Sequence, residues 1–197
     1  MRARRPIVFA LLLAAAVGCQ SRGPNNPPVL SAGAETVRQP DGYVAGVDNF
    51  GFVTDEVWRG AMPTRAGYQS LAAMGVKTVI DLQESDRSDR IPPGVAYVPV
   101  RGSMWRVTEL DVDRVLAEIG RAEKPVFVHC LQGRDRTGLA VAAYRMSRGT
   151  PADEAIRELD RFHINPWQRD GVVRRIRELE RERLARGGSG PSPTGGG

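Results

Sequence analysis

The stretch from Val126 to Gly138, VFVHCLQGRDRTG, carries a thiol and an arginine at a spacing that suits chemistry on an anion. Five residues separate Cys130 from Arg136, so one turn of loop can bring both side chains onto the same anion. A thiol attacks as its thiolate, and converging backbone N–H groups, a helix N-terminus and an arginine all favour that form. The guanidinium of Arg136 is a planar fork that can hold two oxygens of one phosphoryl group. We therefore predict that Cys130 is a nucleophile and that Arg136 stabilises the group it attacks.

The sequence on either side of this motif predicts the elements that would hold it. The apolar, β-branched run 126–128 is typical of a buried strand, and residues 139–148 have the composition and apolar face of a helix. A strand, a tight loop and a helix N-terminus form a phosphate cradle, because backbone N–H groups converge there and the helix dipole adds partial positive charge. The predicted phosphate-binding residues are those of the loop: Leu131, Gln132, Gly133, Arg134, Asp135 and Arg136.

The sequence His129-Cys130-x5-Arg136-Thr137 resembles the signature of cysteine-dependent protein tyrosine and dual-specificity phosphatases. The resemblance implies hydrolysis of phosphomonoesters through a cysteinyl-phosphate, without a metal ion or other cofactor. It also implies that Thr137 stabilises the departing thiolate. His129 is then expected to support the loop and the thiolate from behind rather than to act as a base.

A second resemblance covers residues 49–63, NFGFVTDEVWRGAMP. This segment is similar to the opening segment of the plant-and-fungal type of atypical dual-specificity phosphatases and of their bacterial relatives. In those proteins the segment supplies an edge strand followed by a turn that begins at an Arg-Gly or Arg-Ser pair. Arg59 could reach towards the site, but we expect it to form a structural pair instead.

The general acid of this class is missing from its usual place. These phosphatases protonate the leaving oxygen from an aspartate on a separate loop, which corresponds here to residues 101–107, RGSMWRV, a segment without a carboxylate. Our candidate is Asp135, as an acid or a residue that positions water. The Gly-x-Asp-Arg-Thr sequence resembles the loop of myotubularin-type lipid phosphatases, in which a loop aspartate has that role. Asp135 could equally brace the loop, and both roles stay open.

Three other interpretations of the motif are open. Cys130 could be an ordinary buried cysteine at the end of a strand. A rhodanese-like sulfurtransferase also places a cysteine in an anion-binding loop before a helix, although its loop usually has one residue fewer before the arginine. The third is a catalytically weak, phosphatase-like domain that binds phosphorylated ligands, and the missing acid is the feature that separates it from an enzyme.

The predicted fold is of the α/β type: a central, mostly parallel sheet with helices on both faces and the site at the carboxyl ends of the strands. We expect a helix from Thr64 to Gly75, capped by Thr64, and strands over 76–82 and 95–100. Residues 108–111, TELD, match a capping box that would open a helix reaching about Arg121. Two further helices are expected, over 150–161 and 170–185.

Residues 1–19 have the pattern of a lipoprotein signal peptide. Three arginines among the first five residues precede an apolar run, 7–17, that is too short to span a bilayer comfortably. The run ends in AVGC, which resembles a bacterial lipobox, so we expect Cys19 to be lipidated and to anchor the chain. Ordinary signal cleavage and an uncleaved anchor stay open. Because Gln20 rather than aspartate follows the cysteine, we prefer the outer membrane, with the domain periplasmic or extracellular.

The remaining sequence predicts one domain. Residues 20–42 are rich in Pro, Gly, Ser and Asn and indicate a flexible linker, 43–186 the phosphatase domain, and 187–197 a disordered tail. Cys19 is predicted to be lipidated and Cys130 to be a nucleophile, so we do not expect a disulfide between these two cysteines. The net charge of +5 mildly favours phosphorylated substrates, and no pattern indicates nucleic-acid binding or a metal site. We expect a monomer acting on a phosphorylated protein, an inositol phosphate or a phosphoinositide.

Overall fold

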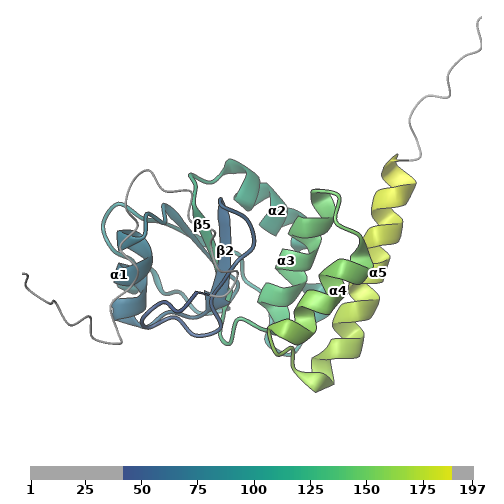
Figure 1. Ribbon diagram of the computed structural model, residues 1–197, viewed down its shortest axis with the longest axis horizontal. Helices are drawn as coiled ribbons and strands as arrows, with labels where there is room; N and C mark the ends of the chain where they lie inside the picture. The colour runs from purple at the N-terminus through teal and green to yellow at the C-terminus, as the bar shows by residue number, and fades with distance from the viewer. Residues whose placement is uncertain (1–41, 188–197) are drawn as a thin grey trace, which may run out of the picture.

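The computed structural model describes residues 42–187 and places a central sheet between two layers of helices (Figure 1). The sheet has five strands in the order β1-β2-β5-β3-β4. β1 pairs antiparallel with β2, and all other neighbours pair parallel. The strands are β1 (Gly51–Phe52), β2 (Val57–Ala61), β3 (Thr78–Asp81), β4 (Ala96–Pro99) and β5 (Val126–Cys130).

The helices cover both faces of this sheet. Helix α1 lies on one side, and α2 to α5 form a layer on the other (Figure 1). The helices are α1 (Arg65–Ala73), α2 (Val112–Arg121), α3 (Asp135–Ser147), α4 (Ala152–Arg161) and α5 (Pro166–Gly187), with short 3₁₀ turns η1 (Ser88–Arg90) and η2 (Val107–Glu109). The predicted α/β fold, a mostly parallel sheet flanked by helices, is confirmed.

The side chains of β5 alternate between the two faces of the sheet, as the two-residue period of a strand requires. Val128 and Cys130 belong to the core beneath α2 to α5, whereas Phe127 belongs to the core on the α1 side. The side chain of His129 also lies on the α1 side, where it meets Tyr68 of α1. The side chains of Cys130 and His129 therefore point to opposite faces of one buried strand.

The predicted element boundaries hold at α1 but fail at α2 and α5. Thr64 caps α1 as expected, accepting a hydrogen bond from the Gly67 N–H at 3.0 Å. The predicted capping box at 108–111 is wrong, because Asp111 is itself the N-cap and accepts from the Arg114 N–H at 2.9 Å. Helix α5 begins at Pro166 rather than near 170, since proline suits a first helical position.

The implied turn at Arg59 and Gly60 is a further difference. Both residues lie inside β2, which pairs with β1 along one edge and with β5 along the other. The edge strand is therefore β1, and Arg59 lies in an inner strand with its side chain buried.

Several predictions fall outside the described residues. The signal peptide with Cys19, most of the linker and the tail beyond residue 187 are among them. Within 42–187, no helix is long and apolar enough to cross a membrane.

Candidate active site

Cys130 is the last residue of β5 and lies against a cavity of about 220 Å³. The thiol is buried and free of any disulfide. The loop that follows, the first turn of α3 and the segment 104–107 build the walls. The lining residues are Met104, Trp105, Val107, Cys130, Leu131, Gln132, Asp135, Arg136, Asn165 and Gln168.

The loop can close around this cavity only because residue 133 is glycine. Gly133 has a φ of +67°, in the left-handed region that side chains disfavour. A Cβ atom there would lie 2.4 Å from the carbonyl carbon of Gly60, in β2. The loop is therefore packed directly against the neighbouring strand.

Helix α3 begins at Asp135, inside the loop and earlier than the predicted start at 139. The Gly138 N–H already donates to the Arg134 carbonyl at 2.8 Å, so the first helical turn starts as the loop ends. This places the N-terminal end of α3 at the cavity, with its unpaired N–H groups and partial positive charge.

Arg136 lies in that first turn and is buried. Its Nη1 atom donates to the Leu82 carbonyl at 2.8 Å and to the Gly102 carbonyl at 2.7 Å. Within residues 42–187 its Nη2 and Nε atoms have no hydrogen-bond partner. The guanidinium plane is thus held from one side, while two donors are left for a ligand in the cavity that Arg136 lines. This arrangement suits the predicted role of Arg136.

Asp135 carries the one carboxylate that lines the cavity within the described part of the chain. Its Oδ1 atom accepts a hydrogen bond from the Asn165 N–H at 2.8 Å, which ties the loop to the start of α5. Two of the acids that follow the segment 101–107 are occupied elsewhere. Glu109 pairs with Arg106 at 3.3 Å, and Asp111 caps α2.

His129 supports the loop from the opposite face of the strand. Its Nε2 atom lies 3.2 Å from the Tyr68 hydroxyl, and its Nδ1 atom lies 3.4 Å from the Cys130 carbonyl and 3.7 Å from Asp81 Oδ1. Burial lowers the pKa of His129 below its ordinary value, more strongly than the Asp81 carboxylate raises it. The ring is therefore neutral at physiological pH, and its packing suits a supporting role.

The Thr137 hydroxyl is buried and has no hydrogen-bond partner among the described residues. An unpaired buried hydroxyl is unusual and often marks a functional group. Thr137 follows Arg136 on α3, where the predicted partner is the departing thiolate of Cys130. That role stays a prediction.

Two side chains from outside the signature stretch contact the back of the loop, and the sequence did not single out the first of them, Asn49. Asn49 donates from Nδ2 to the Gln132 and Gly133 carbonyls, at 3.2 and 3.1 Å. Arg59 forms the expected structural pair, from Nη1 to Glu158 at 3.1 Å, and it also donates from Nη2 to the Gly133 carbonyl at 2.8 Å. An arginine inside an otherwise apolar strand was the available signal for the second of these contacts.

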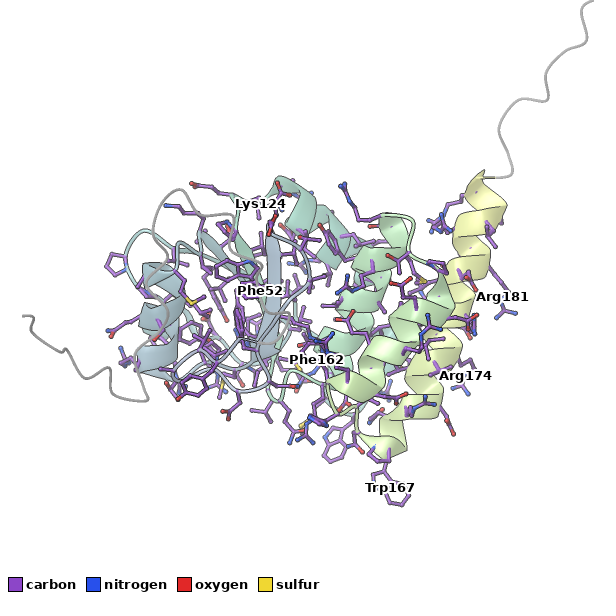
Figure 2. The ribbon with its side chains drawn as sticks, viewed as in Figure 1. Phe52, Lys124, Phe162, Trp167, Arg174 and Arg181 are labelled. Atoms are coloured by element: carbon purple, nitrogen blue, oxygen red, sulfur yellow. The ribbon has the colours of Figure 1, made fainter. Side chains whose placement is uncertain are left out.

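Burial lowers the pKa of Arg59 to about 10, and the neighbouring Glu158 carboxylate opposes that shift. The guanidinium still carries its charge at neutral pH. Its carbon atom also lies 3.7 Å from the centre of the Phe162 ring. Figure 2 shows Phe162 between the sheet and the helical layer.

The mouth of the cavity is apolar and exposed. Trp105 is 80% exposed, and Met104 and Leu131 are 43% and 42% exposed, although all three line the cavity. Trp167 is 93% exposed and projects from the first turn of α5 (Figure 2), between Asn165 and Gln168 in sequence. The exposed apolar groups of Met104, Trp105 and Leu131, which line one cavity, indicate a contact surface for a ligand.

Residues 52–171 match the family model described as "DSP-PTPase phosphatase fused to NAD+ Kinase". The dual specificity protein phosphatase TpbA of Pseudomonas aeruginosa strain UCBPP-PA14 is 31% identical over 168 residues, covering 80% of this chain and 74% of that protein. The crystal structure of P. aeruginosa TpbA superposes with a TM-score of 0.60 at 25% identity, over 72% of this chain and 96% of that chain.

Two further solved structures share the fold. A TpbA variant in complex with pTyr matches with a TM-score of 0.55 at 24% identity, over 70% of this chain and 89% of that chain. The core catalytic domain of the PP-IP phosphatase SIW14 from S. cerevisiae matches with a TM-score of 0.54 at 17% identity, over 72% and 93% of the two chains.

Proposed function

This chain belongs to the dual-specificity, protein-tyrosine-phosphatase-like phosphatases, and on that premise we propose that it hydrolyses phosphomonoesters through a cysteinyl-phosphate at Cys130. The observation that carries the proposal is the convergence of three groups on one small cavity: the Cys130 thiol, the N-terminal end of α3 and the buried guanidinium of Arg136. Each of these groups favours a thiolate or a bound phosphoryl group.

The reaction has two steps. In the first, the Cys130 thiolate forms a bond to phosphorus while the bond to the leaving oxygen breaks, and a proton reaches that oxygen from Asp135. In the second, water attacks phosphorus and passes a proton to the Asp135 carboxylate, the sulfur–phosphorus bond breaks to return the Cys130 thiolate, and phosphate leaves. Arg136 and the backbone N–H groups hold the equatorial oxygens in both steps, and such positioning is the main source of catalysis in phosphoryl transfer.

We propose phosphotyrosine in proteins as the preferred substrate. A phenol has a pKa of about 10, whereas an aliphatic alcohol is closer to water, at about 16. A phenolate therefore leaves more readily with little help from an acid. Among residues 42–187, only the carboxylate of Asp135 lines this cavity, and it already accepts a hydrogen bond from the Asn165 N–H. The apolar mouth formed by Met104 and Trp105 suits an aromatic ring. The TpbA complex with pTyr supports the same substrate class.

The test measures phosphate release from a phosphotyrosine peptide, a phosphoserine peptide, a short-chain phosphoinositide and inositol hexakisphosphate, in reductant and chelator. We expect release from the phosphotyrosine peptide, and none from it with Cys130→Ser. Faster release from inositol hexakisphosphate than from the phosphotyrosine peptide would make inositol phosphates the substrate class instead, in line with the likeness to SIW14. Tight binding of phosphorylated ligands without any release would favour the binding-module alternative.

We further propose that the domain works outside the cytoplasm on a lipid anchor. The support is the sequence of residues 1–19, with its basic start, short apolar run and Cys19. Mass spectrometry of the mature N-terminus is the test. A lipidated Cys19 is expected, and an unmodified N-terminus at another residue would contradict the proposal.

A further inference from the structure

The back of the phosphate loop is held by the side-chain amide of Asn49. Its Nδ2 atom lies 3.2 Å from the Gln132 carbonyl oxygen, 3.1 Å from that of Gly133 and 3.2 Å from that of Phe162. Residues 49 and 133 are 84 positions apart in sequence, so this contact exists only in the folded chain. One amide group thus joins two consecutive loop carbonyls to the C-cap residue of α4.

Asn49 is itself held in an uncommon backbone conformation. Its φ of +52° lies in the left-handed region, which asparagine tolerates better than most residues with a side chain. The preceding carbonyl, that of Asp48, accepts a hydrogen bond from the Ala61 N–H at 2.8 Å. This bond fixes the segment against β2 and aims the amide of Asn49 at the loop.

Arg59 gives the Gly133 carbonyl a second donor. Its Nη2 atom lies 2.8 Å from that oxygen, and its charge strengthens the hydrogen bond. The Gly133 carbonyl therefore accepts from two side chains, one that precedes β1 and one inside β2. Both lie on the side of the loop that packs against β2.

These contacts set the direction in which the loop amides point. A peptide unit is planar, with its carbonyl and its N–H on opposite sides. The carbonyls of Gln132 and Gly133 point towards Asn49. The N–H groups of the same two peptide units, those of Gly133 and Arg134, therefore point the other way, towards the ligand side of the loop. A loop free to rotate these peptides could instead present carbonyl oxygens to an anion, which would repel it. Donors that are fixed in advance cost no reorganisation when charge arrives.

We propose that Asn49 is a positioning residue that keeps the amide donors of the loop turned towards the phosphoryl group. This inference rests on the proposed function, since it takes a phosphoryl group as the ligand of the loop. It assigns Asn49 a role through the loop backbone, without contact to the substrate.

The test is the affinity of the full chain for inorganic phosphate, measured by calorimetry in the Cys130→Ser background so that turnover plays no part. Asn49→Gly removes the amide while allowing the left-handed backbone. Asn49→Asp keeps the shape but sets a carboxylate against three carbonyl oxygens. We expect the Kd for phosphate to rise about tenfold or more for Asn49→Gly and further for Asn49→Asp. With Cys130 restored, we expect a raised KM together with a lowered kcat for a phosphotyrosine peptide.

Thr78→Val is the matched control. The Thr78 hydroxyl donates to the Glu123 carbonyl at 2.9 Å, a buried side-chain-to-backbone bond at the opposite end of the sheet from Cys130. This control should lower Tm without changing the phosphate Kd. If Asn49→Gly also lowers Tm and leaves the phosphate Kd unchanged, the role of Asn49 is structural and the inference is overturned.

The two proposals can fail separately. Turnover by the wild-type chain, with an unchanged phosphate Kd for Asn49→Gly, overturns the positioning role alone. Phosphate binding that depends on Asn49, without turnover of any substrate by the wild-type chain, overturns the proposed reaction and leaves the positioning role in place.

Discussion

The Oδ1 atom of Asp135 lies 2.8 Å from the backbone nitrogen of Asn165 and accepts its hydrogen bond, while Asp135 also lines the cavity of Cys130. One carboxylate thus ties the loop to the start of α5 and lines the cavity in which the proposed reaction needs an acid. The two roles that the sequence left open are compatible, because the brace uses only one of the two carboxylate oxygens.

Asp135→Asn separates these roles. The amide oxygen of asparagine can still accept from the Asn165 N–H, so Tm should change by no more than a degree or two. The variant cannot donate a carboxylic proton, and general acid catalysis typically contributes about 10²–10⁴-fold. We expect kcat for a phosphoserine peptide to fall about 100-fold or more, and kcat for a phosphotyrosine peptide less than tenfold. Full turnover of both peptides by Asp135→Asn would exclude Asp135 as the acid.

Arg136→Lys should abolish most activity while preserving charge. One guanidinium nitrogen bonds to Leu82 and Gly102, and the others remain for phosphoryl oxygens. The single ammonium of lysine cannot meet both demands. Loss of one transition-state donor typically costs about 10²–10³-fold in rate, and we expect kcat/KM for an aryl phosphate to fall by that factor. Arg65→Lys is the control and should retain activity, because the Arg65 side chain is exposed at the start of α1. An equal effect of both substitutions would contradict this role of Arg136.

Stability should fall on acidification because His129 is buried as the neutral form. Its pKa is lowered in the folded chain, so the unfolded chain, with a histidine pKa of about 6.5, binds more protons just below that pH. Stability therefore rises with pH across this window and is lost as pH falls below about 6.5, by up to about 1.4 kcal/mol per pH unit. The measurement is Tm between pH 7.5 and 5.5, for which we expect a decrease in the wild-type chain.

His129→Asn should flatten this dependence, even though it lowers Tm by removing the bond to Tyr68. The control is His163→Asn. His163 is exposed and has a φ of +55°, a conformation that asparagine accepts. If His163→Asn flattened the dependence of Tm on pH and His129→Asn did not, the assignment of this dependence to His129 would be contradicted.

Trp105→Ala should weaken recognition of the substrate without affecting the chemistry at phosphorus. Trp105 lines the cavity yet is largely exposed, so an aromatic leaving group can pack against its ring. Aromatic pairs contribute about 0.5–1.5 kcal/mol beyond area burial. We expect KM for a phosphotyrosine peptide to rise about tenfold and affinity for inorganic phosphate to stay the same. Trp167→Ala, with similar exposure but outside the cavity lining, should change KM less. A larger rise in KM for Trp167→Ala than for Trp105→Ala would place the contact surface for the substrate on α5 instead.

The catalytic motif was predictable because its parts are neighbours in sequence. A strand, its terminal cysteine, a loop with Gly133 and the arginine of the next helix occupy one short stretch, so local propensity and spacing are enough to bring Cys130 and Arg136 together. The α/β fold was predictable for a related reason, since apolar strand patterns alternate with helical ones along the chain. Helix starts were less certain, as at Asp111, because two adjacent residues can compete to be the cap.

The tertiary structure decided which distant groups complete the site. Asn49 and Arg59 reach the Gly133 carbonyl because β2 pairs with β5 in a register that sets Gly60 beside His129 and Ala61 beside Cys130. The carbonyls that orient Arg136 come from the ends of other segments, at Leu82 and Gly102. Such contacts depend on long-range strand pairing, and no local pattern encodes them. The sequence by itself determined the class of fold and the candidate nucleophile with its loop. Strand register and packing decided which side chains contact the back of the loop, where the side chain of His129 points and which carboxylate lines the cavity of Cys130.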